Sequence, residues 1–216
     1  MLNVGFEAIP LEKVRDNSFI LVGSRYRQLT SSTNSKYDFY SLKDVCKIIA
    51  GQSPSSKNYN DNEEGLPFYQ GNVNFDEVYI KPPTIWTTEI TKEAMENDIL
   101  ISVRAPVGAV NICNNHICIG RGLIALRATD KINYKYLFYI MKFYGKNILK
   151  NLSLGSTFEA VTKSDVENFA IPIPSIEEQN EIVAEIESYQ QKILEAKQII
   201  EILNEKINKT INDVWE

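Results

Sequence analysis

The stretch that decides the architecture is residues 171–216, IPIPSIEEQNEIVAEIESYQQKILEAKQIIEILNEKINKTINDVWE. Pro172 and Pro174 forbid helix and favour an extended segment. Ser175 is followed three residues later by Glu178, a capping-box pattern that predicts the first turn of a helix. Because neither Gly nor Pro interrupts the residues after Ser175, one long helix is predicted over 175–216.

Apolar side chains recur along this helix with alternating spacings of four and three residues, the a/d pattern of a coiled coil. The positions are Ile182, Ile186, Tyr189, Ile193, Ala196, Ile200, Leu203, Ile207, Thr210 and Val214. At a rise of ~1.5 Å per residue, about 40 residues span roughly 60 Å, which exceeds the width of a compact domain of this size. We therefore expect a partner helix and a dimer held by Ile182, Ile186, Tyr189, Ile193, Ile200, Leu203 and Ile207. A helix folded back on its own globule is the alternative.

The residues before this helix, 38–174, are predicted to form a globular domain of α/β (α+β) class. Four segments rich in Ile and Val have strand length: 98–103 (DILISV), 107–113 (VGAVNIC), 116–120 (HICIG) and 123–128 (LIALRA). Asn114-Asn115 lies between two of them and predicts a hairpin turn, which would pair Cys113 with His116. Residues 131–150 carry apolar side chains near period 3.6, which predicts a helix.

Residues 1–37 are predicted to be a tail that ends in the polar run QLTSSTNSK (28–36), a linker composition. The chain has 216 residues, and ~100–200 residues make one domain. One large domain with an appended element therefore fits, and two catalytic domains do not.

The net charge of −5 is distributed unevenly along the chain. Residues 176–216 hold 4 Lys and 10 acidic residues, a net of −6, so the first 175 residues carry a net of +1. Within them, residues 121–150 hold seven basic side chains against Asp130 alone. The acidity belongs to the helix, and the basic segment suits a phosphate backbone.

No catalytic motif is found. The sequence lacks G-x-x-x-x-G-K-[ST], G-x-G-x-x-G after a strand, H-E-x-x-H and G-x-S-x-G. The string KPPT (81–84) lacks the residues of an amino-methyltransferase loop and is interpreted as a turn. We expect a non-enzymatic chain that holds no cofactor of its own.

Cysteine and histidine usage gives a second set of expectations. Cys46, Cys113 and Cys118 are the three cysteines, and His116 is the single histidine. Two neighbouring ligands do not make a closed zinc site, which needs four, so no metal is expected. An enzyme using Cys113, His116 or Cys118 is kept as a minor alternative. The odd cysteine count, the absence of a secretory signal and the absence of an 18-residue apolar run favour a cytoplasmic protein.

Several motifs together resemble one half of a type I restriction-modification specificity subunit, a target-recognition domain followed by a spacer helix. The matching segments are 40–45 (YSLKDV), 51–55 (GQSPS), 65–73 (GLPFYQGNV), 98–108 (DILISVRAPVG), 155–158 (GSTF) with Val161-Thr162, and 171–179 (IPIPSIEEQ). Two recognition domains and two antiparallel spacer helices are usual in that family, and this chain has one of each. Residues 9–27 resemble the tail that follows an adenine methyltransferase domain, so the chain is expected to be a half-subunit or the C-terminal piece of a longer protein.

The resemblance implies sequence-specific binding of double-stranded DNA. It also implies an N6-adenine methyltransferase partner that supplies S-adenosylmethionine, a restriction subunit, and a homodimer that recognises a bipartite target. Base readout would come from amide and guanidinium groups in loops. The residues predicted to contact base edges or a groove are Gln52, Ser55, Tyr69, Gln70, Asn72, Arg104 and Arg121. Those predicted to contact the phosphate backbone are Lys57, Lys135, Lys142, Ser156 and Thr157. A protein-interaction adaptor that dimerises through its coiled coil is the alternative function.

Overall fold

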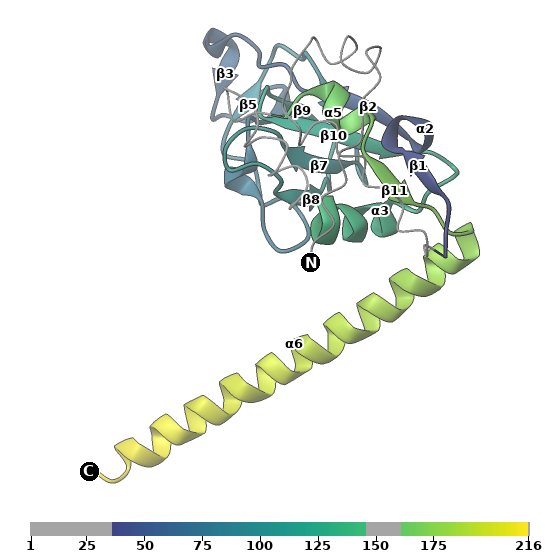
Figure 1. Ribbon diagram of the computed structural model, residues 1–216. Helices are drawn as coiled ribbons and strands as arrows, with labels where there is room; N and C mark the ends of the chain where they lie inside the picture. Colours follow the sequence, from purple (N-terminus) through teal and green to yellow (C-terminus); the bar gives the residue numbers. More distant parts are fainter. Residues whose placement is uncertain (1–35, 146–160, 216) are drawn as a thin grey trace, which may run out of the picture. The chain divides into compact units, whose positions relative to one another are not determined.

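The computed structural model describes residues 36–145 and 161–215. The chain divides into two compact units between Ile173 and Pro174 (Figure 1). The first unit holds all the strands, and the second holds the long helix. This is a mixed α/β fold with a long C-terminal helix, as the sequence predicts.

A four-stranded antiparallel sheet forms the centre of the first unit. Its strands follow the order β2 (Cys46–Ala50), β10 (Leu123–Ala128), β7 (Ile99–Ser102) and β8 (Val110–Ile112). The predicted strand segments 98–103 and 123–128 become neighbours, with Leu126 opposite Ile99 and Leu123 opposite Ser102. All four residues of β7 are buried, the polar Ser102 among them, which explains why its three apolar residues are consecutive instead of alternating with exposed polar ones.

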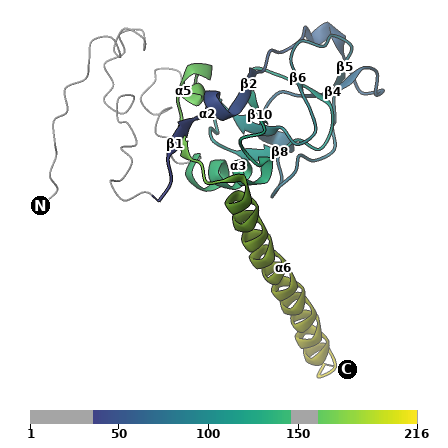
Figure 2. The same cartoon turned by 90° about the vertical axis from the view of Figure 1, so that its right-hand side faces the viewer.

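The second sheet is built from short strands that come from distant parts of the chain. Its order is β3 (Tyr59–Asn60), β5 (Trp86–Thr87), β4 (Leu66–Tyr69), β9 (Ile117–Ile119) and β6 (Glu93–Ala94). Strands β4 and β9 pair in parallel, and the other neighbours are antiparallel. Figure 2 shows β4, β5 and β6 at the end of the unit away from β1 and α5.

The predicted hairpin across Asn114-Asn115 is wrong. Cys113 exchanges backbone bonds of 2.8 Å with Asp98 and Asn97, so the segment ahead of the turn continues beside β7. After the turn, Cys118 lies opposite Phe68 of β4 and Glu93 of β6. The two asparagines therefore carry the chain from one sheet to the other, because the strand before them pairs with β7 and the strand after them pairs with β4 and β6.

Short helices cover the sheets. α2 (Leu42–Val45) follows β1 (Phe39–Ser41), and α5 (Lys163–Glu167) precedes β11 (Ala170–Pro172), which pairs with β1. The 3-10 turns η2 and η3 occupy Ser56–Asn58 and Asn72–Asn74.

Within the described residues, the helix predicted over 131–150 begins later, at Tyr134. The Asn133 side chain caps α3 (Tyr134–Ile140) by accepting from the backbone N–H groups of Lys135 and Tyr136. A π-helical turn, η4 (Met141–Gly145), follows, and residues 146–150 lie outside the described ranges. Lys131 and Ile132 precede the cap, so they are not part of the helix.

A buried cluster joins the two sheets of the first unit. It contains residues from both: Tyr69, Ile80, Ala94, Leu100, Cys113, Ile117, Ile119, Leu123 and Ala125. The Asp98 carboxylate lies at its edge, 1% exposed. It accepts two bonds from Arg127, at 2.9 and 2.8 Å, and one of 2.8 Å from the Met95 backbone N–H. The buried charge is thus paired, as burial requires.

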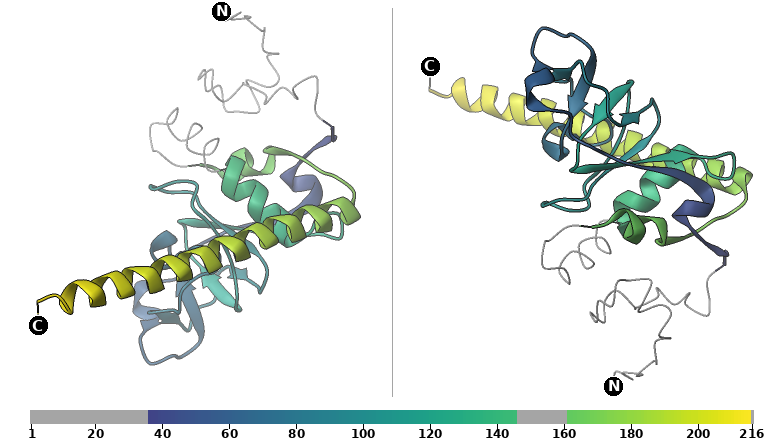
Figure 3. Two further views of the ribbon diagram at one scale, coloured as in Figure 1. Left: turned by 90° about the horizontal axis from the view of Figure 1, so that it is seen from below. Right: turned by 90° about the horizontal axis from the view of Figure 1, so that it is seen from above.

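The second unit is the helix α6 (Ile176–Asn212), a continuous helix in both views of Figure 3. The Ser175 side chain accepts from the Glu178 N–H at 3.2 Å, the cap that the sequence predicts. Gln179 and Val183 are buried, whereas every described residue from Gln191 onward is exposed. No helix within residues 36–145 and 161–215 is both long and apolar enough to cross a membrane.

Candidate nucleic-acid interface

Three polar loops from distant parts of the chain meet where strands of both sheets end. They are residues 51–55 after β2, 70–72 after β4 and 120–122 between β9 and β10. We call them the three-loop surface. Backbone hydrogen bonds hold them together, from Gln52 N–H to Ile119 O at 3.0 Å, from Gly120 N–H to Tyr69 O at 2.8 Å and from Gly122 N–H to Gln70 O at 3.1 Å.

Glycine permits this close approach. A Cβ atom on Gly51 would lie 2.2 Å from the Gly120 carbonyl oxygen, and one on Gly122 would lie 2.4 Å from the Gln70 carbonyl oxygen. Both distances are far inside van der Waals contact, so any side chain would push the loops apart. The glycines bring three backbones into contact, and Gln52, Gln70 and Arg121 beside them are exposed.

The side chains that these loops expose are those suited to base readout. Gln52, Gln70 and Arg121 are exposed, and Asn72 is half-buried. The Arg121 N–H donates to the Ser53 hydroxyl at 3.2 Å, which ties its loop to the first one. Amide and guanidinium groups can each form two hydrogen bonds to a base edge.

Arg104 joins the same neighbourhood through the backbone. The N–H of Val103, the residue before it, donates to the Gly122 carbonyl at 2.9 Å, and Arg104 itself is exposed. Four of the five amide and guanidinium residues predicted from the sequence therefore lie on the three-loop surface. The fifth, Arg104, follows the residue whose N–H bonds to that surface.

A carboxylate outside the loops holds the segment after Gln52. Glu89 Oε2 accepts from the Ser55 N–H at 2.8 Å and from the Asn58 side-chain amide at 2.7 Å. These two bonds, in that order, lower the pKa of the Glu89 carboxyl below its usual value. The Thr91 hydroxyl donates to the Gln52 carbonyl oxygen. Ser55 and Lys57 remain exposed on this anchored segment.

Tyr69 does not belong to the exposed set. It is 2% exposed, its hydroxyl donates to the Lys81 carbonyl at 2.8 Å, and burial raises its pKa to about 12. The prediction missed this because Tyr69 is the last residue of β4 and faces the core, while the loop begins one residue later.

The other predicted cations lie on a different element. Lys135 is half-buried on α3, and Lys142 of η4 donates to the Glu77 carbonyl and lies 5.1 Å from the centre of the Phe138 ring. Phosphate contact by Lys135 and Lys142 therefore stays a prediction, on an element separate from the three-loop surface. Ser156 and Thr157 lie outside the described residues.

Sequence reasoning missed two residues here. Val73, beside Asn72, is 90% exposed, an unusual position for a β-branched apolar side chain. Glu89 positions Ser55 from 34 residues away. Neither residue carries a local signal, because exposure and long-range pairing are properties of the folded chain.

The three cysteines are buried in the fold, and His116 lies beside a carboxylate. Burial raises the pKa of the Cys113 thiol to about 12. His116 Nε2 lies 2.5 Å from Glu93 Oε2. In the part of the chain that the structure describes, no group of three His, Cys, Asp or Glu side chains is placed to hold a metal.

Comparison with known proteins shows the family to which the chain belongs. Residues 34–205 match the family model described as the type I restriction modification DNA specificity domain. Two type I restriction enzyme specificity subunits of Methanocaldococcus jannaschii are similar. The MjaX subunit is 43% identical, over 66% of this chain and 33% of its own length. The MjaIX subunit is 29% identical, over 83% of this chain and 43% of its own length.

Solved structures show the same likeness. A chain from a structure on complex assembly and conformational transition of the type I restriction-modification system gives a TM-score of 0.71 at 35% identity, over 87% of this chain and 50% of that one. The HsdS subunit from Thermoanaerobacter tengcongensis gives 0.66 at 36% identity, over 85% and 46%. The chain thus spans between a third and a half of the length of the relatives it matches.

Proposed function

Because the chain belongs to the family of type I restriction modification DNA specificity domains, we propose that it recognises a specific sequence in double-stranded DNA. The observation that carries this proposal is the three-loop surface, where exposed amide and guanidinium groups from three distant segments are held together by backbone bonds. A specificity domain needs side chains that discriminate base edges, and it needs no catalytic residue of its own.

Base readout is assigned to the residues of the surface and its neighbour. Gln52, Gln70 and Asn72 are suited to adenine, and Arg104 and Arg121 are suited to guanine, because these side chains match those base edges with two hydrogen bonds. Each such pair discriminates by ~1–3 kcal/mol. Ser55 and Lys57 lie on the next segment, where Glu89 accepts from the Ser55 N–H and the Asn58 side-chain amide. Both residues are assigned to the phosphate backbone.

The long helix is assigned to assembly. Its seam residues Tyr189, Ile193, Ile200, Leu203 and Ile207 are each more than half exposed, an apolar surface that water does not favour. We propose that 38–174 forms a target-recognition domain, and that 175–216 pairs with a second copy to give a homodimer that recognises a bipartite target. An N6-adenine methyltransferase that binds S-adenosylmethionine, and a restriction subunit, would act at that target.

Selection of duplexes from a random pool by the full chain tests the proposal. We expect one sequence to be enriched and bound more tightly than its scrambled form. Arg121→Ala should relax the preference at one base pair by about 5- to 150-fold, the equivalent of ~1–3 kcal/mol. Lys206→Ala, which removes the same charge from α6, should leave the preference unchanged.

Two results would contradict DNA recognition by this surface. If no duplex is enriched, the chain is better explained as a protein-interaction adaptor. If a duplex is enriched but Arg121→Ala and Gln70→Ala retain full discrimination, recognition lies elsewhere on the chain.

A further inference from the structure

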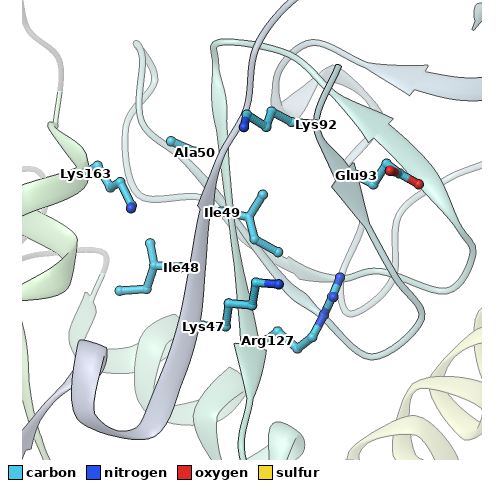
Figure 4. Close-up of a pocket in the computed structure, with 8 residues that line it drawn as sticks. All are labelled: Lys47, Ile48, Ile49, Ala50, Lys92, Glu93, Arg127 and Lys163. Carbon is cyan, nitrogen blue, oxygen red and sulfur yellow. The ribbon is translucent and has the colours of Figure 1, made fainter. Parts of the chain in front are cut away.

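A pocket of about 460 Å³ opens along the edge strand β2 and is lined by cations from four elements. Lys47 lies on β2, Lys92 precedes β6, Arg127 lies on β10 and Lys163 begins α5. Figure 4 shows the three lysines around the strand that carries Ile48 and Ile49, while the Glu93 carboxylate points away from that strand. We call this the β2 pocket.

The positive charge of the β2 pocket is only partly compensated. Arg127 is neutralised by the Asp98 carboxylate, and Glu93 is engaged with His116. Lys163 has a partly exposed partner, Glu167, at 3.1 Å, and pairs at the surface contribute little. Within residues 36–145 and 161–215, no ion pair includes Lys47 or Lys92. The pocket therefore retains cations available to an anion.

The β2 pocket is continuous with the three-loop surface through the backbone. Strand β2 ends at Ala50, and the next residues are Gly51 and Gln52. The Thr91 hydroxyl, one residue before Lys92, donates to the Gln52 carbonyl. The Ile119 N–H donates to the Lys92 carbonyl at 2.8 Å, one residue before the loop 120–122. These bonds and strand β2 thus set where Lys92 and Lys47 stand relative to Gln52 and Arg121.

We propose that Lys47, Lys92 and Lys163 bind phosphates of the DNA strand next to the bases that the three-loop surface contacts. This inference rests on the proposed function and adds residues that hold the duplex in register. Phosphate contacts position a protein on DNA, whereas base contacts specify the sequence. Lysine suits this role because its ammonium group is a point charge on a flexible stem. Continuity with the three-loop surface favours DNA over an acidic protein as the ligand.

The salt dependence of binding by the full chain tests this assignment. Each neutralised phosphate contributes about −0.9 to the slope of log K against log salt concentration. The variant Lys47→Ala/Lys92→Ala/Lys163→Ala should therefore show a slope smaller in magnitude by about 2 to 3. Its affinity ratio between the selected and scrambled duplexes should stay within about twofold of the wild-type ratio, because no base contact is removed.

Two matched variants separate the pocket from general effects. Lys81→Ala/Lys206→Ala/Lys209→Ala removes the same charge elsewhere and should keep the wild-type slope. Lys47→Arg/Lys92→Arg/Lys163→Arg keeps the charge in place and should also keep the wild-type slope. Thermal unfolding of each variant establishes that it is folded before binding is measured.

Other outcomes would overturn the inference in distinguishable ways. If the wild-type chain prefers its selected duplex and the triple alanine variant keeps the wild-type slope, the β2 pocket is not part of the DNA site, and the proposed function stands. If the triple alanine variant loses the difference in affinity between the selected and scrambled duplexes, the lysines contact bases and not only phosphates. An unchanged slope with weakened binding to an acidic methyltransferase partner would assign the pocket to protein. A wild-type chain with no preference for any duplex would instead contradict the proposed function.

Discussion

At the scale of single residues, the Asp98–Arg127 pair is the most consequential contact outside the loops. Asp98 follows Asn97 at the start of β7, and its carboxylate is 1% exposed while it accepts three hydrogen bonds. Arg127, on the neighbouring strand β10, has its pKa raised by the side-chain bond to Asp98. The pair therefore joins β7, β10 and the turn at Met95 in one place.

Asp98→Ala is predicted to destabilise the domain by about 2–4 kcal/mol, because it leaves a partly buried guanidinium without its counter-ion. Glu167→Ala, which breaks the partly exposed pair with Lys163, should cost less than about 1 kcal/mol. Urea unfolding followed by circular dichroism measures both variants. Equal losses in the two would show that burial does not set the strength of these pairs.

At the scale of elements, the loops of the three-loop surface depend on two kinds of glycine. Gly122 has the Gln70 carbonyl oxygen 2.4 Å from where a Cβ would lie. Gly71, in the facing loop, has nothing within 4 Å of its Cβ position and has an extended backbone with φ −161°. A methyl group therefore fits at one position and not at the other.

Gly122→Ala is predicted to cost roughly 1–3 kcal/mol of stability, the range for overpacking, because the obstacle is backbone that cannot swing away. It should also reduce discrimination between duplexes, since it separates Gln70 from Arg121. Gly71→Ala should be tolerated in both assays. Thermal unfolding and duplex binding provide the two readouts, and a loss of discrimination in Gly71→Ala alone would contradict the assigned geometry.

At the scale of the whole molecule, the long helix carries the acidity and an uncovered apolar seam. From Gln191 to Trp215 every residue is exposed, including Ile193, Ile200, Leu203 and Ile207 at 51–58%. Neighbouring apolar residues outside the seam, such as Leu194 and Ile202, are similarly exposed. A helix of this composition is stabilised by a partner more than by its own propensity.

Ile193→Asp/Ile200→Asp is predicted to weaken self-association by roughly 100-fold or more, because each copy would bury uncompensated carboxylates in the seam. Gln198→Asp places a carboxylate on the opposite side of the heptad, at an outward position, and should leave association intact. Sedimentation equilibrium of the full chain measures both variants. A wild-type chain that stays monomeric at high concentration would contradict the proposed homodimer.

The sequence by itself determined the features whose physics is local. The cap at Ser175 and the uninterrupted helix after it depend on residues within a few positions of one another, and α6 begins where they predict. The apolar segments 98–103 and 123–128 likewise contain β7 and β10. The types of side chain suited to base readout were also visible, because they stand in short polar segments of the sequence.

Only the tertiary structure decided which segments become neighbours. Asn114-Asn115 has the composition of a hairpin turn, yet Cys118 pairs with Phe68, 50 positions away, and with Glu93. Tyr69 and Gln70 are adjacent in sequence, but one is buried and the other exposed, because β4 ends between them. The three lysines and Arg127 of the β2 pocket come from four segments without any shared pattern. Strand pairing is chosen by the burial available to the whole chain, and a local pattern carries no information about a partner that folding alone brings near.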